Sequence, residues 1–524
     1  MSRRADGRKG KTKQRCQSRA KRLTAEQIRH RRDCKREAQE ALRERQKAAG
    51  LEPRLPPSIP NRTCEYRSVD EEKAARQNVV LEQLKVMRTQ LPVLLARLGK
   101  ITDPRNPKKL KHQLTLMLVY GILIFVYHMS SRREANRTMT RPMFTDNLRL
   151  LFPELDKLPH LDTLGRLLSS IDDDVSEIEQ THVELIRRLI RKKKFHRYLV
   201  QECYPIAIDA SGKLSRYELL SEQWQQREVG KGDSAKTQYY VSVLEANLAF
   251  HNGMVIPLLS EFLDYTQGDT SNDKQDCEQR AFHRLAARLK HEFPRLPIIV
   301  LLDGLYPNGP IMATCNKYNW QFMIVLQDDS LPSVWEEYYG LLKLEPGNCY
   351  QRAWGQRRQS FQWINDIEYC YGPNERKSLT LHVVTCSEKW EEIDDNANTV
   401  LKTSRHAWIS SKPLKKSNLH QRCNLAARFR WGIEAGFLVE KHHGYQYQHC
   451  FSHNWNVMRG FHFLMRIGHM FNVLAQFSSS LVHTVRRLGV RGFISFLTTT
   501  MQGPWLNAEH VRASLAGPAQ LRLE

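Results

Sequence analysis

YPIAIDASG, residues 204–212, marks the point at which the sequence changes from a helical to a strand pattern. Apolar and β-branched residues lead to Asp209, and Ser-Gly turn residues follow. A second run, LPIIVLLDGL at residues 296–305, is almost entirely apolar, as expected of a central strand covered on both faces, and it ends in Asp303. Each predicted strand therefore ends in an aspartate.

The order of the predicted elements brings these two aspartates together. Residues 238–250 and 254–265 read as two strands joined across Asn252-Gly253, a strong hairpin signal, and a helical pattern follows at residues 271–293. After residue 305 comes a helix-like stretch from about Pro310 and a buried strand at residues 320–329. Strand, hairpin, helix, strand, helix, strand is the order of an RNase H-like mixed sheet. In that order Asp209 and Asp303 lie on neighbouring central strands, although 94 residues separate them.

A third acid comes from ARFRWGIEAGFLVEKHHGYQYQH, residues 427–449. If this stretch is helical, Arg430, Glu434 and Lys441 lie within roughly 40° of one another on one face. This face could be a solvated ion-pair ladder, because Arg430 and Glu434 form a favourable i, i+4 pair. It could equally be a functional arrangement of one carboxylate and two cations. The segment alone does not decide between the two.

The pattern predicts an α/β protein with several domains, since 524 residues exceed one hydrophobic core. We expect a basic disordered arm and linker over residues 1–62 and a helical DNA-binding or assembly domain over 63–200. An RNase H-like core over 201–329 and 416–475 is interrupted by an inserted β subdomain at 330–415. Residues 476–524 form a tail without a clear signal. The apolar run 114–129 spans 16 residues and is too short for a membrane span, so a buried helix is preferred.

Charge and cysteine content limit the function classes. The formal net charge is +24, and residues 1–49 hold 18 Lys or Arg against 6 Asp or Glu, which is half of that surplus. A surplus of this size favours a polyanionic partner, with an anionic membrane surface and simple solubility as alternatives. No pair of the 11 cysteines has CxxC spacing, so we expect reduced thiols in a cytosolic setting. A zinc site at Cys450 and its neighbouring histidines is disfavoured for the same reason.

Two aspartates on neighbouring strands and a glutamate on a helix make an oxygen-ligand set of the kind that Mg²⁺ prefers. Two such ions about 4 Å apart activate the attacking oxygen and stabilise the leaving oxygen in phosphodiester cleavage. Other acids are weaker candidates. Asp328 and Asp329 follow a buried strand, whereas Asp273 and Asp276 open a helix, where the dipole favours acids.

With these residues placed, the chain resembles a DDE transposase of the bacterial insertion-sequence type. Many relatives carry Tyr, two residues, Arg, three residues, Glu, six residues and Lys around the last acid. Arg430, Glu434 and Lys441 have this spacing, while Ala427 stands at the Tyr position. The resemblance covers roughly residues 110–475 and is most specific in the IDASG, LLDG and EKHHGY segments.

The resemblance implies that Asp209, Asp303 and Glu434 bind two Mg²⁺ ions, with Mn²⁺ as a substitute, and form the catalytic triad. It also implies that Arg430 and Lys441 hold phosphates of the transposon ends. Trp354 and Trp363, in the β insertion, are candidates for stacking on a displaced base, although ordinary packing of the insertion is favoured. Relatives act as homodimers or larger synaptic complexes on double-stranded DNA.

The implied activity is metal-dependent cleavage of transposon-end DNA and joining of the 3′ hydroxyl to target DNA by a cytoplasmic, nucleoid-associated bacterial protein. Three alternatives remain: a metal-dependent nuclease without strand transfer, a non-catalytic or domesticated DNA-binding protein and, as the weakest, a membrane protein.

Deleting residues 1–49 is expected to weaken DNA binding and to flatten its salt dependence, because each lost phosphate contact removes one set of released counterions. Fluorescence anisotropy of a labelled duplex over a series of NaCl concentrations measures both quantities. An unchanged salt slope would show that the segment is only a solubility tail.

Overall fold

The computed structural model describes residues 23–53, 63–155, 157–171, 175–268 and 275–524. The chain divides into two compact units. Unit 1 comprises residues 1–57, 340–364 and 384–407, and unit 2 comprises residues 58–339, 365–383 and 408–524. The candidate site residues all belong to unit 2.

The N-terminal part of unit 2 is helical, as predicted for residues 63–200. Its α-helices are α3 (Val69–Arg88), α4 (Leu91–Leu98), α5 (Leu114–Val126), α6 (Arg132–Thr138), α7 (Pro142–Leu151), α8 (Leu161–Ser170) and α9 (Val175–Arg191). Polar side chains start two of them: Ser68 accepts a hydrogen bond from the backbone N–H of Glu71, and Ser131 accepts one from that of Glu134.

Helix α5 is the buried helix predicted for the apolar run. Its residues 117–126 are all buried, and it packs against α14 (Trp455–Gln476). The close approach depends on Gly468, where a Cβ would lie 2.9 Å from the Cβ of Phe125. In the part of the chain that the structure describes, no helix has the length and apolarity needed to cross a membrane.

A mixed sheet forms the centre of unit 2. Its strands are β1 (Tyr204–Arg216), β2 (Gln225–Val229), β3 (Lys236–Ala249), β4 (Val255–Phe262), β5 (Ile298–Leu302), β6 (Gln321–Val325) and the end of β10 (Thr399–Ser410). They are ordered β2-β3-β1-β5-β6-β10, and β4 pairs with β3. β1, β5 and β6 are parallel, whereas β3 and β10 run antiparallel to their neighbours. β1 lies beside β5, as predicted, and the predicted hairpin turn joins β3 to β4 at Asn252-Gly253, where Gly253 has φ +90°.

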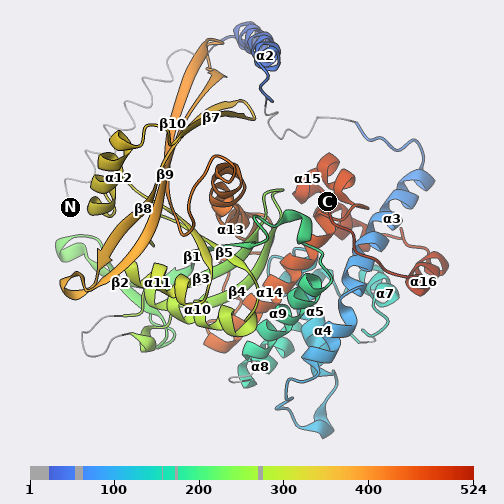
Figure 1. Cartoon of the computed structure of the whole chain (residues 1–524). Coiled ribbons are helices and arrows are strands. Elements are labelled where there is room, and N and C mark those ends of the chain that lie inside the picture. The colour runs from blue at the N-terminus through green and yellow to red at the C-terminus, as the bar shows by residue number, and fades with distance from the viewer. Residues whose placement is uncertain (1–22, 54–62, 156, 172–174, 269–274) are drawn as a thin grey trace. The chain divides into compact units, whose positions relative to one another are not determined.

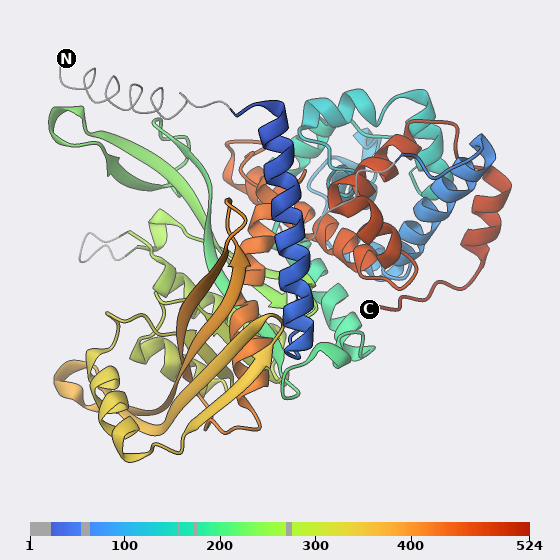
Figure 2. The same ribbon diagram turned by 90° about the horizontal axis from the view of Figure 1, so that it is seen from above.

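Helices pack around the sheet of unit 2 (Figure 1). α10 (Glu278–Glu292) contacts β3, β4 and α11 (Gly309–Lys317), and α14 contacts β4, α9 and α3. α14 therefore joins the sheet to the N-terminal helices. The paired β1, β2 and β3 strands extend as a twisted ribbon (Figure 2).

The predicted end of the first strand is wrong. Instead of turning at Ser211-Gly212, β1 continues to Arg216 because its pairing with β3 continues, with an irregularity between Gly212 and Leu214. Ser211 and Gly212 thus pair with β3 inside the strand rather than forming a turn, and the irregularity follows them at Lys213.

The predicted regular helix over residues 427–449 is also wrong in part. The chain forms a π-helical turn at His420–Ala426, a 3₁₀ turn at Ala427–Trp431 and then α13 (Gly432–His442). Gly444, with φ +109°, follows the end of this helix, and the chain continues from there as a loop. The tail, without a clear signal in the sequence, contains α15 (Val482–Met501) and α16 (Ala508–Ala516).

The predicted basic arm and β insertion differ from the structure in two helices. Residues expected to be disordered form α2 (Ala25–Ala48), which begins with a capping box of Thr24 and Gln27. The predicted β insertion opens with α12 (Pro332–Leu344), and its strands β7 (Cys349–Trp354), β8 (Arg357–Tyr371), β9 (Lys377–Ile393) and β10 follow. Within unit 1, Lys35 of α2 pairs with Asp395 at 2.7 Å, and the resulting ion pair anchors the helix to the β9–β10 turn. Residues 1–22 and 54–62 of the predicted arm and linker lie outside the described residues.

Candidate active site

Two of the predicted site residues lie at the same level of neighbouring strands. β1 and β5 pair in parallel with Ala207 opposite Leu301, and the same register carried on by two residues sets Asp209 beside Asp303. Local hydrogen bonds orient both carboxylates: the backbone N–H of Ala210 donates to Asp209 at 2.8 Å, and that of Leu305 donates to Asp303 at 2.9 Å. Both aspartates are thus held where the β1–β5 pairing ends.

Glu434 reaches the same place from the first turn of α13. It forms an ion pair of 3.0 Å with Arg430, and a second guanidinium nitrogen of Arg430 lies 3.9 Å from Asp209. Arg430 is almost completely buried, and its Nε and Nη1 have no hydrogen-bond acceptor. This cation therefore joins two of the three carboxylates while keeping donor capacity unused.

The carboxylates perturb one another. Burial raises the pKa of Asp209 to about 6, with repulsion from Asp303 as the next cause and attraction by Arg430 opposing both. Burial likewise raises the pKa of Glu434, although Arg430 lowers it and Asp303 raises it further. The three acids predicted from the sequence are therefore close enough to interact, and Arg430 alone does not neutralise them.

A fourth acid was missed. Glu278, in the first turn of α10, accepts a hydrogen bond from the hydroxyl of Tyr306 at 3.5 Å. Burial and repulsion from Asp303 raise the pKa of Glu278, and burial together with Glu278, Asp209 and Asp303 raises the pKa of Tyr306. In the sequence, Glu278 is only an acid near the start of a predicted helix, where the helix dipole favours negative charge. This pattern does not indicate that Glu278 lies near Asp303.

Lys441 lies on the last turn of α13. Burial lowers its pKa, while Glu440 and Asp209 favour the charged form. Its Nζ is 5.8 Å from the ring centres of Phe437 and of Tyr447. Lys441 thus acts on the same electrostatic cluster as Arg430.

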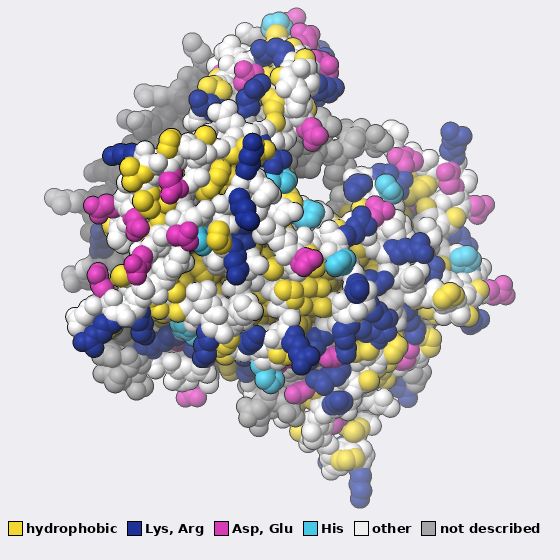
Figure 3. Space-filling model, in the orientation of Figure 1, with side chains coloured by type: hydrophobic (Ala, Val, Ile, Leu, Met, Phe, Trp, Pro, Cys, Tyr) yellow, Lys and Arg dark blue, Asp and Glu magenta, His cyan; other side chains and the backbone are white. Residues whose placement is uncertain are grey.

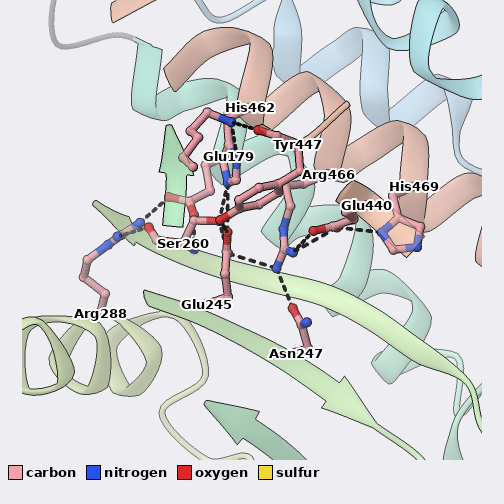
Figure 4. A network of polar contacts seen from close by, with 11 residues as sticks. Glu179, Glu245, Asn247, Ser260, Arg288, Glu440, Tyr447, His462, Arg466 and His469 are labelled. Carbon is pink, nitrogen blue, oxygen red and sulfur yellow. Dashed lines mark hydrogen bonds and ion pairs between the residues drawn. The ribbon is translucent and has the colours of Figure 1, made fainter. Parts of the chain in front are cut away.

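A buried ion-pair network fixes α13 and α14 to the sheet behind this site (Figure 4). Arg466 of α14 pairs with Glu440 of α13 and with Glu245 of β3, each at 3.1 Å. Glu440 also contacts His469 at 2.7 Å. Because Glu245 is the cross-strand partner of Asp209, the network links the strand beside one acid to the helix that carries Glu434.

Further polar groups satisfy Glu245. The hydroxyls of Ser260 and Tyr447 donate to it at 2.6 and 3.2 Å, and His462 lies 3.2 Å away. Burial raises the pKa of Glu245, but Arg466 and His462 outweigh this effect and lower it overall. Glu245 is therefore held as an anion inside the protein.

The acid cluster has the chemistry, but not the close convergence, of a site for a divalent cation. Within the described residues, no three His, Cys, Asp or Glu side chains converge closely enough to form a ready metal site. The donor chemistry nevertheless fits Mg²⁺: oxygen ligands come from three separate elements, and a cation would relieve the repulsion that raises the pKa values of Asp209 and Glu434.

The weaker candidates lie elsewhere. Asp276 is buried and paired with Arg284 at 2.7 Å, so it has a structural partner, and Asp273 lies outside the described residues. Asp328 and Asp329 are exposed. In the β insertion Trp363 is 6% exposed, which agrees with packing rather than with base stacking, whereas Trp354 is half-buried.

Basic side chains cover much of the helical region of unit 2 on the face drawn in Figure 3, where acidic side chains are fewer. The loop before α5 contributes exposed Lys108, Lys109 and Lys111. This face therefore has the charge expected of a polyanion-binding surface.

Comparison with known proteins adds a finding for the same helical region. Residues 95–184 match the family model described as DDE_Tnp_1-associated. The match points to a transposase family, and it runs from α4 into α9, before the strands and helix that carry the acids. Comparison with curated proteins found no match.

Asp209→Asn is expected to stabilise the metal-free protein at pH 7.5 by about 1–3 kcal/mol. The raised pKa of Asp209 means that the parent is most stable, with respect to this group, below its ordinary pKa of 3.8. That stability is lost as the pH rises through about 6, whereas Asn does not ionise. Urea unfolding in EDTA at pH 4 and pH 7.5 measures the difference, with the exposed Asp329→Asn as control. If the difference in unfolding free energy between Asp209→Asn and the parent is the same at both pH values, the raised pKa of Asp209 is contradicted.

Arg466→Met is expected to destabilise the protein by about 3–5 kcal/mol, because it leaves Glu245 and Glu440 buried without their shared cation. Adding Glu245→Gln and Glu440→Gln should restore part of the loss. Thermal unfolding of the parent, the single variant and the triple variant tests this, with the exposed Arg512→Met as control. Equal melting temperatures for the parent and Arg466→Met would show that the network does not hold the helices.

Proposed function

We propose that this chain is a DDE transposase with an RNase H-like core that cleaves transposon-end DNA with Mg²⁺ and joins the 3′ hydroxyl to target DNA. The observation that carries the proposal is the placement of Asp209 and Asp303 at one level of adjacent parallel strands, with Glu434 interacting electrostatically with Asp303. The match of residues 95–184 to a transposase-associated family model supports it independently.

In this proposal Asp209, Asp303 and Glu434 hold two Mg²⁺ ions, or Mn²⁺ in their place. When bound, the ions activate the attacking oxygen and stabilise the leaving oxygen of the phosphodiester. Glu278 adds negative charge beside Asp303, which strengthens the attraction for cations.

Arg430 and Lys441 hold the DNA phosphates. The buried Nε and Nη1 of Arg430 lack acceptors, and phosphate oxygens would satisfy both. Lys441 provides a second charge on the same side of α13, where its interaction with Asp209 places it near the acids. The substrate and the cations together thereby neutralise the cluster.

The partner in this proposal is double-stranded DNA, both transposon end and target, met at the bacterial nucleoid by a homodimer or a larger synaptic complex. The basic face over the helical region of unit 2 supports a role in DNA binding. The same activity without strand transfer would make the chain a metal-dependent nuclease.

One observation favours a second candidate, a non-catalytic DNA-binding protein. Arg430 lies within ion-pair distance of both Asp209 and Glu434, and in a protein without metal it would hold the place of a cation between them. Such a protein would bind DNA ends but leave them uncut.

Cleavage of DNA flanking the coding region, incubated with Mg²⁺, tests the proposal. Asp209→Asn, Asp303→Asn and Glu434→Gln are each expected to lower the cleavage rate on the order of 100-fold or more, since even a 1 Å misplacement at a reacting centre costs this much. Asp329→Asn, at an exposed aspartate in the segment after β6, is the control.

Variants that cleave as fast as the parent would refute the triad. Binding of the end by the intact protein without cleavage would favour the second candidate, and cleavage without joined products would favour the nuclease.

A further inference from the structure

A cavity of 450 Å³ opens at the end of the unit 2 sheet opposite to the acids. Its lining includes Cys203, Ile298 and Gln321, which lie where β1, β5 and β6 begin. The acids lie where the β1–β5 pairing ends. The five residues of β5 separate the two places by roughly 16 Å.

The cavity is lined by hydrogen-bond donors. Lys290, Arg295 and Lys412 line it together with the amides of Asn316 and Asn319, and no Asp or Glu is among its lining residues. Within the described chain, none of these three cations forms an ion pair with a carboxylate at 4 Å or less. The cavity therefore carries a positive charge that the protein itself does not balance.

Lys290 already has hydrogen-bond partners within the protein. Its Nζ donates to the backbone carbonyls of Pro294 and Tyr318 at 2.8 and 3.1 Å, and it thus offsets the negative ends of α10 and α11. Arg295 and Lys412 are exposed and have no such contact with the helix ends among the described hydrogen bonds. These two side chains are the cations left for an anionic ligand.

Trp320 provides the second, independent observation. It is 3% exposed and lines the cavity, and its indole N–H has no acceptor. A buried donor without a partner is costly, and such a group in a native protein commonly has a bound ion, water or ligand as its acceptor. Any partner of this N–H would accept a hydrogen bond, as an anionic oxygen or a water does.

The buried guanidinium of Arg422 contacts a residue that lines the cavity. Arg422 bonds the side-chain carbonyls of Gln201 and Gln321 at 3.0 and 2.6 Å, and Gln321 lines the cavity. Burial lowers the pKa of Arg422 to about 10, and within the described residues no carboxylate forms an ion pair with it. Its charge adds to the positive potential of the cavity.

We infer that this cavity is a phosphate-binding site, with Arg295, Lys412 and the Trp320 indole N–H as ligands of the anion. The phosphate belongs either to a DNA backbone or to a free phosphate ion, since both present the same oxygens. The site is separate from the proposed catalytic cluster and does not depend on cleavage activity.

The test uses the full chain, inorganic phosphate and a 20-base-pair duplex. Titration with phosphate is followed through the indole N–H signals of the ten tryptophans in ¹⁵N-correlated NMR spectra. One indole signal, absent in Trp320→Phe, is expected to shift. Arg295→Gln/Lys412→Gln is expected to weaken phosphate binding about tenfold or more, because charge-assisted hydrogen bonds are lost. Lys192→Gln/Arg512→Gln, exposed and outside the cavity, is the control with the same change in charge.

Duplex binding over a NaCl series separates the two sources of phosphate. If DNA is the source, the Arg295/Lys412 double variant also loses duplex affinity, and its salt slope falls by about 1–2 relative to the control. If only free phosphate binds, the duplex affinity and slope equal those of the control. The inference is overturned if phosphate shifts no Trp320 signal, or if the double variant binds phosphate and duplex as the control does. Loss of cleavage in the triad variants would leave all of these outcomes unchanged, so the two proposals fail separately.

Discussion

The architecture of unit 2 depends on one buried cation. Arg466 is shared between Glu245 of the sheet and Glu440 of α13, and it is itself part of α14. Removing two carboxylates and a guanidinium from water costs several kcal/mol for each ion, so the arrangement persists only because every charge has hydrogen-bonded partners. Its geometric effect is specific: it ties the strand beside Asp209 to the helix that presents Glu434.

The candidate active site has the opposite electrostatic character. Behind it, acids and bases are matched and Glu245 is held ionised, whereas at the site acids outnumber the cations that contact them and the pKa values of Asp209 and Glu434 are raised. A network in which every charge has an opposite partner is rigid, because any movement would cost a charged group its favourable interactions. An unmatched cluster gains from any added cation or from a substrate that brings one, as expected of a site that binds ions and phosphates in succession.

Positive charge is distributed differently from the acids. It covers much of the helical region of unit 2 on the face drawn in Figure 3. It also lines the cavity at the far end of the sheet, where Arg295, Lys412 and Trp320 have no Asp or Glu beside them among the described lining residues. The acids thus lie at one end of the parallel strands β1 and β5, and the basic cavity lies at the other end. Under the proposed function, a DNA duplex would contact basic surface away from the acids, and this contact would supply binding energy at a distance from the reacting bond.

The sequence alone determined the β1–β5 neighbourhood and the β3–β4 hairpin, because apolar periodicity and hairpin residues are local signals. It also marked Asp209, Asp303 and Glu434 as candidate site residues. It did not determine that β1 continues beyond Asp209, that residues 420–431 form π and 3₁₀ turns, or that residues 25–48 form a helix, since pairing and packing decide these features. Glu278, Arg466 and Trp320 were equally inaccessible from the sequence. Their roles arise from neighbours that are distant along the chain, and only the tertiary structure brings such neighbours within range of electrostatic and hydrogen-bonding interactions.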